Sequence, residues 1–500
     1  PVIVRATRQW FADLRLISQS SVAALADVNV VPPSGLKRLE SMLGTRQDWC
    51  ISRQRAWGVP IPVLYDVQTD EPLLTEESIA HIRGLMHTHG SDCWWSLSVE
   101  ELLAPEFREN GRKYRRGLDT MDVWFDSGSS WAGVLGTRHL PFPADVYLEG
   151  SDQHRGWFQS SLLTAVAVHN GVAPYKTLLT HGFLLDEKLQ KMSKSIGNVI
   201  EPSHVIEGGK DKTKSPAYGV DAMRLWVAST DYTNDVVISD SLLASVFTSM
   251  KKLRNTARFM LGVLNDFIPK QNEVPYEHLH PLDKYMLHKL SAFVASTTAA
   301  YDAYSFFTVI RDVNHFANTD LSAFYLNILK DRLYSPIPDD TGRRSAQTTI
   351  MYILDAFAKV LAPITCHTSE DIYQFIPWRK GADNSSNPIN SIYFEGWPVL
   401  QAAWKNEELN KSWDQILEIR SHAYRLIEHM RASDGVSQSS EIDVDIFTSA
   451  NHPIRTLLST QDLEELLIAA QVHTRDLSLA EAEGAVFEET KDNSVAPTYA

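Results

Sequence analysis

The run Lys191-Met192-Ser193-Lys194-Ser195 carries the clearest chemical signal in the chain. Its two ammonium groups can both face one anionic ligand, and the serine hydroxyls add neutral hydrogen-bond donors. A triphosphate attacked at its α-phosphorus needs positive charge on the leaving pyrophosphate, and lysine supplies that charge as a mobile point. A Lys-x-x-Lys pair alone is typical of a solvated basic turn, but the full run behind a strand-like segment favours a phosphate-binding loop. We therefore expect Lys191, Ser193 and Lys194 to be catalytic groups that act on nucleotide phosphates.

A second dense group of polar residues spans 147–158, where a predicted strand end passes into a helix start. In an open α/β sheet, ligands bind beyond the carboxyl ends of the strands. The carboxylates of Glu149 and Asp152 can accept hydrogen bonds from an amine or from ribose hydroxyls, and the Gln153 amide can donate and accept. Gly150 lets a ligand come close to the backbone. Asp152 alone could instead cap the following helix, but the length of the run favours a binding site.

His154 and Arg155 lie inside this run and invite a catalytic interpretation. In-line attack on a phosphate needs positioning and charge stabilisation more than it needs a general base. We therefore expect both residues to have structural roles.

Two aromatic runs, 49–58 and 124–129, complete the candidate site. Tryptophan can wall a small apolar pocket, although most of the thirteen tryptophans are expected in the core. Arg53 and Arg55 could position phosphates or pair with carboxylates, and the sequence favours neither alternative.

An α/β layer is needed to position these groups. Over residues 1–238, short apolar strands alternate with helical patterns, which predicts a parallel sheet. Strands are expected at 145–148 and 175–180. A helix is expected between them, capped by Ser151 or Asp152 and running to about Asn170.

Helical spacing of apolar residues begins at about Ser239 and predicts an all-α bundle over 239–400. Its further helices are expected around 282–304, 306–333 and 343–362, with Pro363 as a kink or a boundary. Residues 401–500 are expected to form a small α+β region, with helices at 409–430 and 453–470 and a strand with one exposed face at 441–447.

Composition limits the partners and the chemistry. The net charge of −15 argues mildly against nucleic-acid binding by the chain as a whole. Any RNA contact must therefore use a local cluster such as Lys251, Lys252, Arg254 and Arg258. The three cysteines lie far apart and have no zinc-ligand spacing, so we expect neither a disulfide framework nor a metal site. No apolar stretch approaches the length needed to cross a membrane.

Taken together, these runs resemble the class I aminoacyl-tRNA synthetases, and specifically their isoleucyl branch. The lysine run is similar to the class I signature loop, and 148–158 looks like isoleucyl enzymes rather than valyl, leucyl or methionyl ones. Residues 49–58 and 122–129 are similar to connecting segments of that branch. Runs at 221–226, 254–259 and 324–332 also look like the family, and the resemblance extends over about 5–397.

The resemblance implies a fold and a reaction. The fold would be a partial Rossmann-like catalytic domain over 1–238, an all-α anticodon-binding bundle over 239–400 and a small α+β region over 401–500. The protein would be an isoleucine–tRNA ligase that converts ATP, with Mg²⁺, and isoleucine to isoleucyl-adenylate and then transfers isoleucine to tRNA(Ile). It would act as a monomer, away from membranes and without zinc.

Roles for single residues also follow from the resemblance. Glu149 would contact the aminoacyl-adenylate, and Gly150, Asp152 and Gln153 would line its ribose side. Trp124 and Trp157 would form the walls around the isoleucine side chain. His181 and Gly182 would lie near the nucleotide, and Lys194 would contact ATP phosphate.

Departures from the family leave alternatives open. The other class I signature, His-x-Gly-His, is absent, and 87–90 only resembles it in composition. That signature and the inserted editing domain are expected to precede residue 1, so these 500 residues alone are expected not to aminoacylate. A non-catalytic tRNA-binding module and a valyl or leucyl ligase are the alternatives. The expected compartment is the cytoplasm or the mitochondrial matrix; the lack of a zinc module and an inserted loop near 208–214 favour the matrix.

Overall fold

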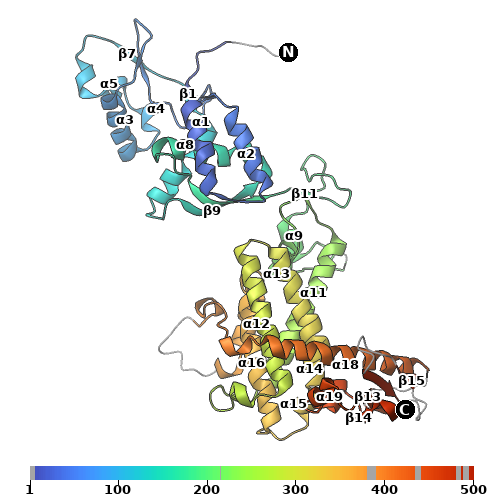
Figure 1. Cartoon of the computed structure of the whole chain (residues 1–500). Helices are drawn as coiled ribbons and strands as arrows, with labels where there is room; N and C mark the ends of the chain where they lie inside the picture. The colour runs from blue at the N-terminus through green and yellow to red at the C-terminus, as the bar shows by residue number, and fades with distance from the viewer. Residues whose placement is uncertain are drawn as a thin grey trace. The chain divides into compact units, whose positions relative to one another are not determined.

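The computed structural model of the chain describes residues 6–213, 215–379, 390–433, 441–479, 486–487 and 495–499 (Figure 1). Contacts divide the chain into two compact units. The first comprises residues 1–183 and 233–235, and the second comprises 184–232 and 236–500. No helix within the described ranges is both long and apolar enough to cross a membrane.

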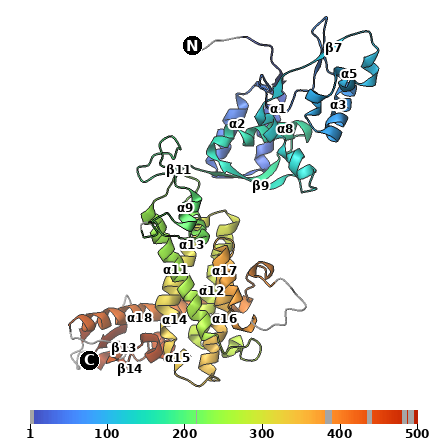
Figure 2. The ribbon, with the colours of Figure 1, turned by 180° about the vertical axis from the view of Figure 1, so that it is seen from behind.

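A three-stranded parallel sheet forms the centre of the first unit. Its strand order is β2 (Asn29–Val31), β10 (Tyr175–His181) and β9 (Ala144–Gly150), so β10 is bonded on both sides. Helices α1 (Arg15–Ala24), α2 (Ser34–Gly44) and α8 (Trp157–Val168) share one apolar core with the strands. Figures 1 and 2 show these helices beside the sheet. The two predicted strands and their parallel arrangement are confirmed.

Helix α8 begins later than predicted. Ser151–Arg155 forms a 3₁₀ turn, and neither Ser151 nor Asp152 caps a helix. Gly156 leaves the helical conformation, with ψ at −117°, and Gln153 Oε1 accepts the hydrogen bond from Trp157 N at 3.0 Å. The prediction of a cap at residue 151 or 152 is therefore wrong, because Gln153 supplies the cap one turn further along the chain.

Shorter elements complete the first unit. A small antiparallel sheet and the helices near it pack around buried Trp94. His87 and His89 lie in the last turn of one of these helices rather than at a helix start, as the wrong order of the motif indicates. The remaining bounds are β1 (Phe11–Asp13), β3 (Asp48–Cys50), β4 (Ser52–Arg53), β5 (Leu64–Asp66), β6 (Pro72–Leu73), α3 (Glu76–His89), α4 (Cys93–Ser96), α5 (Val99–Leu102), α6 (Pro105–Arg108), β7 (Tyr114–Arg116), β8 (Thr120–Met121) and α7 (Val123–Gly128).

The second unit is mainly helical. Its helix α11 (Asp240–Val263) is capped by Ser239, whose Oγ accepts from Leu242 N at 3.2 Å, so this helix begins where the helical spacing of apolar residues begins. The predicted helix over 306–333 is broken by a π-helical stretch at Phe316–Tyr325. The other elements up to residue 374 are β11 (Leu184–Leu185), α9 (Pro202–Glu207), α10 (Val220–Ala228), β12 (Val236–Val237), α12 (Pro281–Asp302), α13 (Phe306–His315), α14 (Leu326–Ile328), α15 (Lys330–Tyr334), α16 (Thr341–Leu361) and α17 (Cys366–Gln374).

The C-terminal part of this unit joins the bundle core. On α18 (Glu407–Ser433), Trp413 stacks on Tyr285 of α12, with ring centroids 4.7 Å apart. The strand expected at 441–447 is β13 (Asp443–Thr448), but the prediction of one exposed face is wrong, because residues 444–448 are all buried. The helix expected at 453–470 is divided into two. The remaining elements are α19 (Pro453–Leu458), α20 (Leu463–Leu467), β14 (Gln471–Asp476), β15 (Val486–Phe487) and β16 (Val495–Tyr499).

A buried ion cluster ties α20 to the bundle. The Asp283 carboxylate, fully buried, accepts hydrogen bonds from Arg332 Nη1 at 2.9 Å, Tyr325 Oη at 2.7 Å and Ser345 Oγ at 2.6 Å. Glu465 of α20 lies 3.0 Å from Arg332 Nε. Burial raises the pKa of Glu465 to about 7, although Arg332 opposes the shift.

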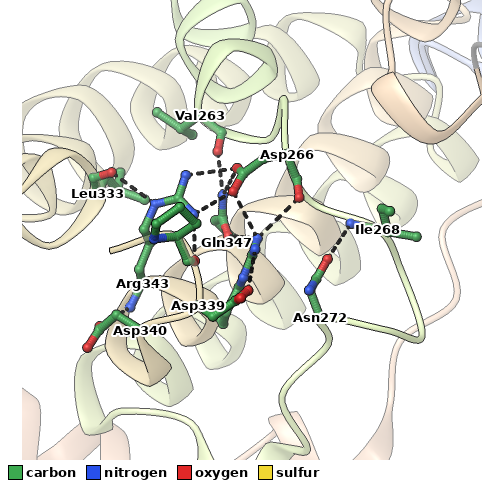
Figure 3. A network of polar contacts seen from close by, with 11 residues as sticks. Val263, Asp266, Ile268, Asn272, Leu333, Asp339, Asp340, Arg343 and Gln347 are labelled. Atoms are coloured by element: carbon green, nitrogen blue, oxygen red, sulfur yellow. Dashed lines mark hydrogen bonds and ion pairs between the residues drawn. The ribbon is translucent and has the colours of Figure 1, made fainter. Parts of the chain in front are cut away.

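A second polar joint connects α16 to the turn that follows α11 (Figure 3). Arg343 donates to both oxygens of Asp266, at 2.7 and 2.8 Å. Gln347 Nε2 donates to Asp266 Oδ1 at 2.9 Å and to Val263 O at 2.7 Å. The hydrogen bond from Arg343 lowers the pKa of Asp266 from 3.8 to about 2.

This joint predicts an acid dependence of stability. The pKa of Asp266 is lower in the folded state than its ordinary value of 3.8, so its contribution is complete well above pH 4 and is lost as the pH falls through about 2. We expect Asp266→Asn to lower the melting temperature at pH 7 and to have a much smaller effect as the pH falls through about 2. Thermal unfolding at several pH values checks this, with exposed Asp302→Asn as the control. An equal effect of Asp266→Asn at every pH would contradict it.

Candidate active site

The carboxyl ends of β9 and β10 lie side by side in the first unit. Glu149 is in register with Thr180, and Gly150 with His181. A Cβ atom on Gly150 would lie 2.8 Å from Asp152 Oδ1 and 3.5 Å from His181 Cε1. A glycine at this position therefore lets the Asp152 and His181 side chains both lie close to the end of β9, where the sequence predicts the ligand.

Polar groups at these strand ends are open to a ligand. The side chains of Glu149 and Asp152 are exposed. His181 Nδ1 lies 2.7 Å from the Gly182 carbonyl oxygen. Because that oxygen can only accept, Nδ1 donates to it. The two carboxylates suit a ligand that is rich in amine and hydroxyl donors.

Packing alone explains why residue 182 is a glycine. A Cβ atom at this position would lie 2.3 Å from Asn234 C and O, so only glycine lets residues 233–235 pass. Phe183 N then donates to Asp235 Oδ1 at 2.7 Å. This close packing accounts for Gly182 without any role for a nucleotide. The position of Gly182 near the nucleotide stays a prediction.

A pocket of about 290 Å³ opens in the same unit. Residues from 49–58, 122–129 and 148–158 line it together, so the structure unites three runs that the sequence singled out. The lining residues are Arg46, Asp48, Trp49, Cys50, Arg53, Asp122, Trp124, Arg155, Gly156 and Ser160.

Trp124 forms one wall of this pocket. A Cβ atom on Gly156 would lie 2.7 Å from the Trp124 ring and 2.5 Å from Gln153 Oε1, so glycine lets the indole lie against the run. Trp157 has different surroundings: its ring stacks on Tyr147 at 4.1 Å between centroids, and it does not line the pocket. The structure thus brings Trp124, but not Trp157, to this pocket.

Asp122 organises the floor of the pocket. This buried carboxylate accepts from Trp49 Nε1 at 2.8 Å and pairs with Arg53 Nη2 at 3.2 Å. Arg53 thus has a carboxylate partner, which is one of the two alternatives left open for it. Arg46 Nη1 donates to buried Gln159 Oε1 at 2.5 Å. Burial lowers the pKa of Arg46, so its charge is costly until an anion approaches.

His154 and Arg155 differ in their roles. The His154 ring is 2% exposed, and its Nδ1 lies 2.8 Å from Ser151 O. Burial lowers the pKa of His154, which favours the neutral ring. These contacts support the structural role expected for His154. Arg155 is exposed and lines the pocket, so a purely structural role does not describe it.

The lysine loop belongs to the second unit. Asn198 shapes it: Oδ1 accepts from Ser193 N at 2.9 Å, and Nδ2 donates to Asp186 Oδ2 at 2.9 Å. This bond from Asn198 is the main reason that the pKa of Asp186 is lowered. Lys191 and Lys194 are both exposed. The loop therefore presents its ammonium groups from a braced turn.

Comparison with known proteins agrees with this architecture. The family of tRNA synthetases class I (I, L, M and V) matches residues 2–239, and the anticodon-binding domain of tRNA ligase matches residues 283–446. The chain belongs to the class I tRNA synthetases. The Rossmann-like catalytic fold followed by a helical anticodon-binding domain is thereby confirmed, and the boundaries predicted at 238 and 400 stay predictions.

Several relatives of this class I synthetase chain are similar over most of its length. The isoleucine–tRNA ligase of Microcystis aeruginosa is 51% identical over 445 residues, which are 89% of this chain and 46% of that protein. The chain spans about half the length of the curated relatives that it matches.

Two solved structures share the fold. One is the Agrobacterium radiobacter LeuRS–tRNA–LeuAMS ternary complex, with a TM-score of 0.51, 18% identity, and coverage of 89% of this chain and 50% of that one. The other is Mycobacterium tuberculosis methionyl-tRNA synthetase in complex with methionyl-adenylate, with a TM-score of 0.51, 17% identity, and coverage of 73% and 62%.

Three residues of the candidate site were not singled out from the sequence. No motif marks Arg46, which lines the pocket, Gln159, to which Arg46 donates, or Asn198, which braces the lysine loop. The family-like run 221–226 forms a structural joint: Asp221 Oδ2 accepts from Thr368 N at 2.6 Å, at the start of α17. Within the described ranges, no group of three or more His, Cys, Asp or Glu side chains is placed to hold a metal ion.

Proposed function

We propose that this chain carries the amino-acid activation site of an isoleucine–tRNA ligase. The observation that carries the proposal is that Glu149, Asp152 and His181 lie at or just beyond the ends of two parallel strands, in a chain 51% identical over 445 residues to an isoleucine–tRNA ligase. In the first step the isoleucine carboxylate attacks the α-phosphorus of ATP, and pyrophosphate leaves. In the second step a ribose hydroxyl of tRNA(Ile) attacks the adenylate carbonyl, and AMP leaves.

Glu149 contacts the aminoacyl-adenylate in this proposal, and Gly150, Asp152 and Gln153 lie along its ribose. The nucleophile of the first step is already ionised at neutral pH, so the site needs no general base. It needs donors and cations where charge develops. This requirement fits a cluster in which the buried histidine, His154, makes only a local contact.

The other predicted residues have supporting roles. Trp124, which lines the pocket, packs against the isoleucine side chain. Trp157 supports the run 147–158 by stacking on Tyr147. His181 and Gly182 border the nucleotide. Lys191, Ser193 and Lys194 act on the ATP phosphates, with Mg²⁺ accompanying the triphosphate as part of the substrate.

A groove of about 680 Å³ between α11 and α17 supports tRNA as the partner. Arg254, Asn255 and Arg258 line it from α11, and Phe375, 54% exposed, lines it after α17. Arg254 pairs with Asp371. Arginines beside amides and an exposed ring suit an unstacked RNA nucleotide, because each group meets a different part of it.

Loss of Arg258 is therefore expected to weaken tRNA binding about tenfold through a lost phosphate contact. The slope of log Kd against log salt should become shallower as well. Fluorescence anisotropy with labelled tRNA(Ile) measures both quantities for Arg258→Gln. Arg311→Gln, at an exposed position on α13, is the control. Unchanged affinity and salt dependence in Arg258→Gln would remove this groove from the proposal.

Isoleucine-dependent ATP–pyrophosphate exchange by the full-length gene product tests the function. Strong exchange with isoleucine, and weaker exchange with valine and leucine, is expected. Exchange driven best by valine or leucine would select the valyl or leucyl alternative. Silence with all three amino acids, alongside tRNA binding, would leave the non-catalytic tRNA-binding module.

The proposal takes the protein to act as a monomer in the cytoplasm or the mitochondrial matrix. The cyanobacterial origin of the relatives adds no support for the matrix.

A further inference from the structure

The 290 Å³ pocket carries more positive charge than its own carboxylates neutralise. Three guanidinium groups and two carboxylates line it. One carboxylate, Asp122, is committed to Arg53 and Trp49. Within the described residues no carboxylate forms an ion pair with Arg155, which is exposed at the pocket. The pocket is therefore built for an anion rather than for an apolar side chain.

Arg46 is held ready for that anion. Its Nη1 donates to Gln159 Oε1 at 2.5 Å, and the guanidinium lies 5.1 Å from the centre of the Trp49 ring. Gln159 is buried, so it fixes the fork in one orientation. An arginine that is partly stripped of water and already oriented loses little conformational freedom when it binds a phosphate. Burial also lowers the pKa of Arg46, and a bound anion would offset that shift.

The position of the pocket selects among the anions of the proposed reaction. Trp124 and Gly156 place it beside the proposed aminoacyl site. The residues proposed to hold the adenylate, Glu149, Asp152 and His181, do not line it. At the low end of the usual range of ligand-pocket volumes, it suits one phosphate group and its ribose better than a nucleoside triphosphate. The isoleucine carboxylate must meet the α-phosphorus of ATP at the adenylate site, so the anionic reactant that remains for this pocket is the tRNA acceptor end.

We propose that Arg46 and Arg155 bind the phosphodiester on the 5′ side of the terminal nucleotide of tRNA, and so position its ribose hydroxyl for the transfer step. The half-exposed Trp124 ring lines the pocket beside that phosphate. This inference rests on the proposed function and assigns its second step to a pocket separate from the strand ends.

The test compares the two steps in the full-length gene product. Single-turnover transfer from preformed isoleucyl-adenylate to tRNA(Ile) is measured beside ATP–pyrophosphate exchange, which needs no tRNA. In Arg46→Gln and in Arg155→Gln, we expect the transfer rate at limiting tRNA to fall about tenfold or more relative to the exchange rate. Arg46→Lys keeps the charge without the fork and should recover part of the rate. Arg138→Gln, an exposed arginine outside the pocket, is the matched control.

A second readout keeps the pocket testable without catalysis. tRNA(Ile) lacking its terminal nucleotide should bind the wild type more weakly than intact tRNA does, and the two RNAs should bind each arginine variant about equally. Thermal unfolding of each variant shows whether the fold is kept.

Three results would overturn the inference. Equal loss in both steps would make these arginines general parts of the site. A raised KM for ATP with a normal transfer rate in the arginine variants would show that the pocket binds ATP phosphate instead of tRNA. Unchanged rates together with unchanged discrimination between the two tRNAs would leave the pocket without a role in anion binding. If the wild type shows no exchange with any amino acid, the proposed function fails, and the comparison of the two tRNAs still reports on the pocket.

Discussion

Isoleucine-dependent ATP–pyrophosphate exchange is expected to fall about 100- to 1000-fold when Lys194 is replaced by alanine in the full-length gene product. The exposed ammonium group lies in a loop whose backbone is held by hydrogen bonds of Asn198 with Ser193 and Asp186. These bonds limit the positions that the Lys194 side chain can reach. Charge on the leaving pyrophosphate develops mainly in the transition state. Loss of the cation should therefore lower kcat more than it raises the KM for isoleucine.

Lys188→Ala is the matched control for that measurement. Lys188 is also exposed and lies only six residues away, but it belongs to the turn before the loop, where its backbone N donates to Asp186 Oδ1 at 2.9 Å. Its removal should leave the rate of exchange within about twofold. If Lys194→Ala and Lys188→Ala had equal effects, the assignment of the phosphate-binding role to the lysine run would be wrong.

Replacement of Arg332 by methionine is expected to lower the free energy of unfolding of the helical unit by about 3–5 kcal/mol. Arg332 is 8% exposed and donates to both oxygens of Asp283, at 2.9 and 3.0 Å. Without it, a carboxylate that has no access to water keeps only the hydroxyl groups of Tyr325 and Ser345. Glu465 would lose its cation at the same time. Differential scanning calorimetry or urea unfolding followed by helical circular dichroism measures the loss.

A paired substitution separates the charge from the packing. In Asp283→Asn with Arg332→Met the uncompensated charge is gone, so part of the lost stability should return. Arg311→Met removes an exposed arginine, 67% accessible, whose ion pair is with its neighbour Asp312, and should change stability by less than about 0.5 kcal/mol. A double variant no more stable than Arg332→Met would show that packing, rather than charge, carries the effect.

Local patterns were sufficient for much of the fold. Runs of apolar residues marked β9 and β10, and Ser239 marked the start of α11 through its side-chain cap. Positions set by particular side-chain contacts were not predictable. Helix α8 starts at Trp157 because the Gln153 side chain supplies its cap, and residues 444–448 are buried by neighbours that the strand pattern does not reveal.

The same limit applies to the candidate site. The strand-end residues could be found because one short run contains most of them. The pocket could not be found in this way, since Trp49 and Asp122, which hold its floor together, are 73 residues apart in sequence. Arg46 and Gln159 are 113 residues apart. Pairings over such distances depend on the finished fold, and a single sequence carries no direct record of them.

Residues 233–235 return to the first unit, where their backbone passes over Gly182. A ribosome makes the chain from its N-terminus at about 5–20 residues per second. The first unit therefore remains incomplete for several seconds after residue 183 is made, while roughly fifty residues of the second unit emerge. For the same reason, no single cut in the gene separates the two units intact: a fragment that stops at 183 lacks its last three residues, and one that starts at 184 carries them without their partner.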